Sequence, residues 1–416
     1  MSRDKQACRG LGIASVMGMV CAPWVAQADV IDDSHFKVDT RNFYLHRNYT
    51  NTNAPVSEVH SWSQGFDAQF TSGYTDTALA VGLDVDAQYA VRLDSSGNDG
   101  SLPFSVHDQQ TANDYSRAGA TLKMRYSKTE LKVGDLRPQY PVAFDDPSRQ
   151  LDTLYQGAVV ESKEVEGLTL TGGRFWSAVT RESSNHEKLY KFGSTDNLDS
   201  DGLDFGGATY DISKNLQASY FYGVLHDIYQ QHYFGLMHVA ELGNGYKLKT
   251  DLRYFNNNED GNALNGEIDN RSWGTLFSLF KGAHMVGLSY QRMLGDSVFP
   301  TMNGYIPQPY LVHWSSLGFV RPGERSWAAR YSYDFAGMGL PGLKFVTRYT
   351  KGTQWDRGAN LSDNQESERF LGFNYVVQSG ALQGLGFDLR NIDVKQKYGY
   401  DYNEFRVATT YTWKFW

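Results

Sequence analysis

The chain has 416 residues, of which 14% are aromatic and 41 are glycine, and its formal net charge is −8. Its mean hydropathy is −0.50. The acidic balance argues against nucleic acid as a partner, because proteins that bind phosphate backbones concentrate positive charge. Both cysteines, Cys8 and Cys21, lie near the N-terminus. Loss of that segment would exclude disulfides, thiol nucleophiles and cysteine-ligated metals.

Residues 1–28 have the three zones of a secretory signal peptide: a basic start, an apolar middle, and Ala26-Gln27-Ala28 at the end. We predict cleavage after Ala28. The apolar stretch is too short for a spanning helix, and an ordinary buried helix would not show this zoning. Cleavage would remove three basic and one acidic residue, leaving a net charge near −10. No linker or composition shift divides residues 29–416, so we expect one domain.

The first long strand pattern is TALAVGLDVDAQYAVRL, residues 77–93. From Leu79 to Leu93 every odd position is apolar, while the even positions are small, polar or charged. This alternation is about twice as long as a usual strand. A soluble antiparallel sheet could show it once, with its apolar face on a core. A membrane barrel shows it in every strand.

The alternation recurs along the chain, in residues 60–74, 116–127, 246–255, 326–335, 343–349, 385–391 and 405–415. Short breaks fall at 212–215, 242–245 and 338–342, and long polar segments at 94–115, 137–155, 179–200, 256–270, 295–324 and 352–365. Short turns at one rim and long loops at the other are typical of outer-membrane barrels. The sequence therefore predicts an all-β transmembrane antiparallel β-barrel of 16 to 20 strands, wide enough for an aqueous lumen.

The last strand presents an apolar face of alternating residues that ends at Phe415. It resembles the aromatic-terminated segment by which the barrel-assembly machinery recognises its clients, with Trp416 as one extra residue. We therefore expect that machinery, outer-membrane lipid and lipopolysaccharide as partners.

The inward face of the predicted strands is rich in cations. Residue parity places the following side chains in the lumen: Arg41, Arg92, Arg117, Lys123, Arg125, Lys132, Lys247, Lys249, Arg253, Arg330, Lys344, Arg348, Arg390 and Arg406. Confined cations concentrate anions, and arginine forks suit carboxylates. The alternative is that each cation pairs with an inward acid. The candidate acids are fewer: Asp67, Asp84, Asp86, Asp251, Asp334 and Asp388.

The segment 137–155 is the second candidate for function. Three prolines stiffen it, and it contains Asp145, Asp146, Ser148, Arg149 and Asp152. Loops of this length are usually functional. Folded inward, this one would narrow the lumen and set carboxylates opposite the basic wall. The alternative is a solvated extracellular loop.

Three stretches, 126–151, 38–49 and 373–391, resemble the OprD-type substrate-specific porins of Gram-negative outer membranes. The resemblance implies an 18-stranded monomeric barrel, a third loop folded into the pore, and a ladder of basic residues for small carboxylates such as amino acids, short peptides or aromatic acids.

By matching position, the resemblance gives a pore eyelet of Asp145, Asp146, Ser148 and Arg149. It gives Arg41, Arg125 and Arg390 as ladder residues, with Arg330 and Arg348 matching less closely; parity adds Lys123, Arg253 and Arg406. The chain departs from the family pattern at Pro147 and Asp152, which leaves the shape of the loop tip and the substrate open. We expect Asp145, Asp146 and Ser148 to engage ammonium or hydroxyl groups and to exclude wide or dianionic solutes.

Two other classes of function were weighed. An outer-membrane barrel enzyme such as a hydrolase would need a catalytic motif, and none is recognisable. Residues 226–238 hold three histidines without metal-site spacing, so we predict no metal or cofactor. Residues 196–204 faintly resemble a calcium loop but lack its ligand order, which leaves loop calcium as a weak alternative. A plugged, non-conducting binding barrel would need a domain before the first strand, yet the strand pattern starts about ten residues after Ala28. A passive diffusion channel in the outer membrane is the favoured interpretation.

Overall fold

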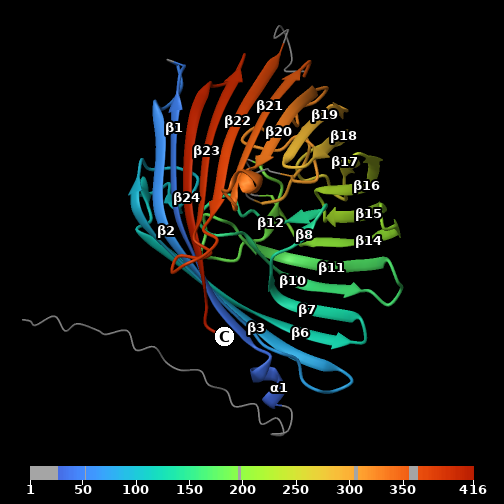
Figure 1. Cartoon of the computed structure of the whole chain (residues 1–416). Helices are drawn as coiled ribbons and strands as arrows, with labels where there is room; N and C mark the ends of the chain where they lie inside the picture. Colours follow the sequence, from blue (N-terminus) through green and yellow to red (C-terminus); the bar gives the residue numbers. More distant parts are fainter. Residues whose placement is uncertain (1–26, 52, 195–197, 304–307, 356–363) are drawn as a thin grey trace, which may run out of the picture.

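The computed structural model describes residues 27–51, 53–194, 198–303, 308–355 and 364–416. Its main sheet has 18 strands, and each pair of neighbouring strands is antiparallel. The first strand, β1 (His35–Tyr49), pairs with the last, β24 (Tyr402–Lys414), which closes the sheet into a barrel. Figure 1 shows this closure, with β1 and β24 side by side. The predicted fold class is confirmed.

The barrel strands follow one another around the wall. Between β1 and β24 they are β2 (Glu58–Thr71), β3 (Ala80–Ser95), β6 (Asp114–Tyr126), β7 (Thr129–Leu136), β10 (Leu154–Ser162), β11 (Leu168–Val179), β14 (Leu203–Ser213), β15 (Leu216–Leu225), β16 (Tyr229–Gly243), β17 (Tyr246–Glu259), β18 (Asp269–Lys281), β19 (His284–Leu294), β20 (Arg325–Asp334), β21 (Leu343–Thr353), β22 (Gln365–Val376) and β23 (Gly386–Gln396).

The remaining elements are short. They are the helix α1 (Gln27–Asp32), the 3₁₀ turn η2 (Phe335–Met338), and six two-residue strands: β4 (Phe104–Ser105), β5 (Gln110–Thr111), β8 (Gln139–Tyr140), β9 (Ala143–Phe144), β12 (Leu189–Tyr190) and β13 (Asp199–Ser200).

The two-faced alternation predicted for 77–93 is present in β3. Leu83, Val85 and Tyr89 are exposed on the outer face, while Asp84 lies inside and pairs with Lys123 of β6. The strand begins three residues later than predicted. Residues 77–79 belong instead to a turn in which the Thr77 hydroxyl donates to the Leu79 carbonyl.

The two rims of the barrel differ as predicted. Short turns such as 214–215 and 244–245 lie at one rim, and long connections lie at the other. Helix α1 is at the short-turn rim, because Gly73 in the β2–β3 turn donates a backbone hydrogen bond to Val30. In outer-membrane barrels the short turns face the periplasm.

Long connections from the opposite rim fold into the barrel. We call residues 137–153 loop 3, residues 180–202 loop 4 and residues 295–324 loop 7. Figure 1 shows β8 of loop 3 and β12 of loop 4 within the ring of strands. Val142 of loop 3 and Phe299 of loop 7 are buried in one cluster with Phe175 and Phe255 of the inner wall. The loops and the inner wall therefore form one buried apolar core, and the lumen is narrowed where the loops lie.

Residues 1–26 lie outside the described residues, so the signal peptide stays a prediction; its expected cleavage point, after Ala28, falls within α1. Across the described ranges, none of the helices has the length and apolarity to cross a membrane.

Candidate functional site: a basic cavity between loops 3 and 7

Loop 3 is fixed to the wall on the side of β1 and β2. The Gln150 amide donates to the Arg41 carbonyl at 3.0 Å and accepts from the Ser63 hydroxyl at 2.9 Å. The Arg41 guanidinium in turn donates to the carbonyls of Pro147 and Arg149. These contacts hold the loop tip across the lumen.

Asp146 anchors loop 3 to loop 4. Its carboxylate lies 2.9 Å from the Arg181 guanidinium and accepts a hydrogen bond from the Ser148 amide, also at 2.9 Å. Asp146 and Arg181 are both buried. A buried carboxylate needs such a partner, because removing it from water is otherwise costly. Asp146 is thus a structural counter-ion, a role that the sequence pattern did not reveal.

Asp145 is buried as well, at 4% exposure, and one of its carboxylate oxygens has no hydrogen-bond partner. It faces a void of about 40 Å³ that Tyr229 and Gln231 also line. Burial, then the neighbouring carboxylate of Asp152, raises the pKa of Asp145 to about 7. Asp145 and Asp146 therefore line this void and not the basic wall that they were expected to face.

A basic cavity, here called the main cavity, has a volume of about 310 Å³. Ser148 and Arg149 of loop 3 lie on one side of it, and strands β19 to β24 form the other. Loop 7 covers it with Trp314, Ser315 and Ser316. Of the four predicted eyelet residues, Ser148 and Arg149 thus reach the main cavity.

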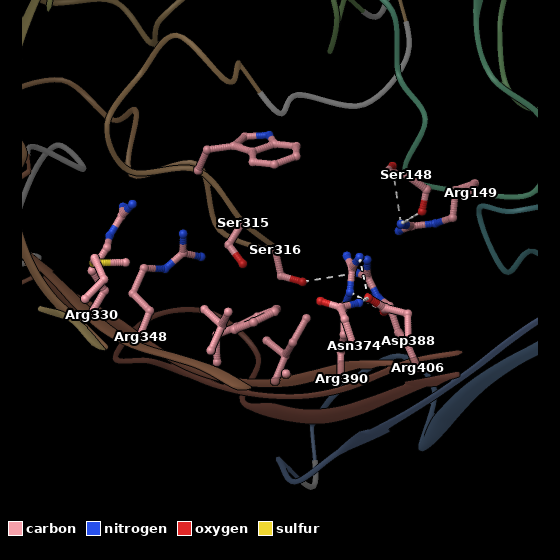
Figure 2. A pocket seen from close by; sticks show the side chains of 16 residues that line it. Ser148, Arg149, Ser315, Ser316, Arg330, Arg348, Asn374, Asp388, Arg390 and Arg406 are labelled. Atoms are coloured by element: carbon pink, nitrogen blue, oxygen red, sulfur yellow. Dashed lines mark hydrogen bonds and ion pairs between the residues drawn. The ribbon is translucent and has the colours of Figure 1, made fainter. Parts of the chain in front are cut away.

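Four of the predicted ladder arginines line the main cavity: Arg330, Arg348, Arg390 and Arg406. They form two cross-strand pairs, because Arg330 is the register partner of Arg348, and Arg390 that of Arg406. Figure 2 shows the first pair at one end of the cavity and the second pair at the other.

Acidic side chains neutralise this wall only in part. Arg348 lies 3.1 Å from the fully buried Glu368, Arg390 contacts Asp388, and Arg406 contacts Glu404. Glu404 is shared with Arg47 at 2.6 Å. Within the described residues, Arg330 has no acidic partner.

The alternative, that each inward cation pairs with an inward acid, therefore holds for several arginines. These pairs do not cancel the positive charge of the cavity wall. Of the acids named from the sequence, Asp388 is the one in the main cavity. Glu368 and Glu404 occupy inward positions of β22 and β24, so strand parity could have found them.

The other predicted ladder residues lie elsewhere. Arg41 lines a second cavity of about 430 Å³, together with Asp67 and Arg137. Arg137, which the sequence reasoning missed, contacts both Asp67 and Asp86 at 2.8 Å.

Three further cations have different surroundings. Lys123 pairs with Asp84 at 2.7 Å. Arg125 stacks on Tyr74 at 4.1 Å near the short-turn rim. Arg253 donates to the carbonyls of Pro309 and Leu311, so it holds loop 7.

Loop 7 is the part of the site that the sequence reasoning left without a role. Its His313 is buried between the hydroxyls of Ser289 and Ser326. Burial lowers the pKa of His313 to about 3, so this ring is neutral under ordinary conditions. Its neighbour Trp314 covers the main cavity, and the indole N–H of Trp314 is buried without a hydrogen-bond partner.

The histidines of 226–238 do not converge: His226 contacts Asp204, and His232 contacts the Tyr220 hydroxyl. In the part of the chain that the structure describes, no group of three or more His, Cys, Asp or Glu is placed to hold a metal ion. Residues 195–197 lie outside the described residues, so the segment 196–204 is not placed as a whole.

Comparisons with known proteins agree with this architecture. The family described as "outer membrane porin, OprD family" matches residues 28–415. The porin-like protein GalP of Pseudomonas putida is 34% identical over 386 residues, covering 92% of each chain. The crystal structure of OpdL of Pseudomonas aeruginosa is 43% identical with a TM-score of 0.84, covering 93% of this chain and 100% of that one. OpdK of the same organism, crystallised with vanillate, is 32% identical with a TM-score of 0.88 at the same coverage.

Proposed function

The chain belongs to the OprD family of outer-membrane porins, and we propose that it admits small carboxylate-bearing nutrients across the outer membrane by passive diffusion. Amino acids and aromatic or other organic acids are the candidate substrates. The observation that carries the proposal is the row of arginine forks on the wall of the main cavity, opposite loop 3. Arginine binds carboxylates with two parallel hydrogen bonds, which gives both attraction and orientation.

In the basic ladder, the carboxylate of the substrate would exchange with protein carboxylates as the partner of each arginine. A carboxylate entering the main cavity meets Arg330 and Arg348, and then Arg390 and Arg406. Glu368, Asp388 and Glu404 compete for the same guanidinium groups. This competition weakens each site enough for the substrate to leave, as conduction requires. Arg41 and Arg137 beside the second cavity would take the carboxylate further toward the short-turn rim.

Ser148 and Arg149 are the proposed eyelet residues. They project from loop 3 toward the paired arginines (Figure 2). Asp145 and Asp146 would act indirectly, by fixing the loop behind them. OpdK was crystallised with vanillate, an aromatic carboxylate, and this supports the same substrate class for the present chain.

The relatives are porins, and we propose that this chain likewise has no enzymatic activity. We propose further that it works as a monomer, surrounded by lipid and lipopolysaccharide after insertion by the barrel-assembly machinery. Each apolar outer face, exposed on residues such as Leu252, Leu288 and Phe373, suits contact with acyl chains.

Single-channel recording in a planar bilayer tests the proposal, with benzoate and arginine titrated in turn. Conductance steps that one of these solutes interrupts at low concentration would support a carboxylate-selective pore. Replacement Arg390→Ala should weaken that block about tenfold, because a charge-assisted hydrogen bond contributes about 1.5–3 kcal/mol. A barrel that stays silent under all conditions would contradict the proposal and would direct attention to the hydrolase alternative.

A further inference from the structure

The main cavity has two separate positive ends. Arg330 and Arg348 belong to adjacent strands β20 and β21, and Arg390 and Arg406 to adjacent strands β23 and β24. Strand β22 lies between them, with Phe370 opposite Arg348 and Gly372 opposite Arg390. Neighbouring strands are about 4.8 Å apart, and Phe370 and Gly372 are two residues apart along β22, so the backbones of Arg348 and Arg390 are separated by about 12 Å.

The wall between the two ends is apolar. Val346, Phe370 and Ile392 line it, and Trp314 of loop 7 covers it. Gly372 lets the Phe370 ring lie against the β22 backbone between the arginine pairs, since a Cβ added at Gly372 would come within 2.9 Å of that ring. The middle of the main cavity thus favours an apolar group and offers it contact on two sides.

Each end retains donors or charge that the protein leaves unsatisfied. At the first end, the Nε atoms of Arg330 and Arg348 are buried without hydrogen-bond partners in the described structure, and Glu368 is the one acid in contact with the two arginines. At the second end, three arginines face two acids. Asp388 contacts Arg390, whereas Glu404 contacts both Arg406 and Arg47. Like charges placed directly opposite each other across strands are destabilising, so both pairs are suited to an added anion.

We propose that the main cavity recognises a dicarboxylate whose two carboxylates are held apart by an apolar spacer. One carboxylate would bind Arg330 and Arg348, the spacer would lie between Trp314 and Phe370, and the other carboxylate would bind Arg390 and Arg406. This inference rests on the proposed function and names its substrate class. It departs from the expected exclusion of dianions, which depended on Asp145 and Asp146 facing the cavity; both are buried and line a separate void.

The test compares three ring acids as blockers of single-channel current: benzoate, phthalate and terephthalate. Phthalate and terephthalate have the same charge and atoms, and they differ in the separation of their carboxylates. We expect terephthalate to block at about tenfold lower concentration than either of the others. Equal block by phthalate and terephthalate would overturn the two-ended site, because charge alone would then explain the binding.

Variants separate the site from the general function. Arg330→Gln should reduce the advantage of terephthalate over benzoate about tenfold, since a charge-assisted contact is lost at one end. Arg330→Lys keeps the positive charge but not the two-donor guanidinium, and it should reduce the advantage of terephthalate less than Arg330→Gln does. Arg271→Gln is the matched control, because Arg271 pairs with Asp269 on the outer face of β18.

The outcomes are distinguishable. If none of the three acids alters the current, the proposed carboxylate uptake itself fails. If all three block equally, or if Arg330→Gln changes their block to the same extent, the two-ended site fails while a carboxylate porin stands.

Discussion

Asp145 and Asp146 are adjacent in sequence, yet their environments are different. Asp146 has the Arg181 guanidinium at 2.9 Å, whereas Asp145 is buried with one oxygen unpartnered. Burial raises the pKa of Asp145, the carboxylates of Asp152 and Asp146 raise it further, and Arg137 opposes them. Of these two neighbouring aspartates, Asp146 anchors loop 3 through an ion pair, and Asp145 is a buried carboxyl with a pKa of about 7.

The raised pKa of Asp145 predicts that loop 3 loosens as pH rises. Between the usual pKa of 3.8 and about 7, the folded loop holds a proton that the unfolded loop releases. Stability of the packed loop is therefore greatest at low pH, falls as pH rises to about 7, and is constant above that value. Hydrogen-exchange protection of residues 143–153 should be higher at pH 5 than at pH 8, and Asp145→Asn should abolish the difference. The same difference in the variant would contradict this role.

Removal of Arg181 should release the tip of loop 3. Arg181→Ala leaves the Asp146 carboxylate buried without its ion pair, and breaking a buried pair costs about 3–5 kcal/mol. We expect a larger unitary conductance and weaker discrimination among carboxylates. Arg174→Ala is the control, because Arg174 and Asp204 form an exposed pair worth about 0–1 kcal/mol. Conductance that stays unchanged in Arg181→Ala would show that loop 3 is held mainly by Gln150 and Arg41.

At the scale of elements, strand β22 couples the basic wall to loop 7. The fully buried Glu368 carboxylate contacts Arg348 with one oxygen and accepts the Leu317 amide hydrogen bond with the other, at 2.9 Å. Leu317 follows Ser316, which covers the main cavity. The Glu368 side chain therefore affects both the charge at Arg348 and the position of loop 7 over the main cavity.

Replacement Glu368→Gln should make the pore more selective for anions. The amide oxygen can still accept from Leu317, so loop 7 should keep its place, while Arg348 gains one unit of uncompensated charge. Reversal potentials in a KCl gradient should shift toward the chloride potential. Glu241→Gln is the control, since Glu241 is exposed and pairs with Lys247 at the short-turn rim. Equal reversal potentials in the two variants would contradict the role of Glu368.

The sequence predicted the elements well because each strand lies between two environments. Lipid on one side and water on the other impose a period of two, so inward residues such as Arg330 and Arg406 could be assigned by parity alone. The pairing of Asp146 with Arg181 could not be predicted this way. It joins two irregular loops that are distant in sequence, and no periodicity relates them. Loop 7 was missed as the cover of the main cavity for the same reason.

At the scale of the whole molecule, the barrel must close without leaving an edge. Unpaired backbone groups are costly in lipid. The pairing of β1 with β24 extends beyond the strands themselves: Phe415 donates its amide to the Phe36 carbonyl at 3.0 Å, and Phe36 donates to the Trp416 carbonyl at 3.3 Å. Trp416, which looked like one extra residue in the sequence, therefore continues the closing ladder.

Deletion of Trp416 should weaken this closure measurably. It removes the hydrogen bond from Phe36, the ring contact of Trp416 with Phe36 at 5.2 Å, and the indole contact with Ser34. These contribute about 1–2.5 kcal/mol together, so the unfolding temperature in detergent should fall by about 1–3 °C. Trp416→Ala keeps the backbone hydrogen bond and should lower the temperature less. Unitary conductance should stay the same in both variants, because Trp416 is not among the residues that line the main cavity. An unchanged unfolding temperature on deletion would show that closure is complete at Phe415.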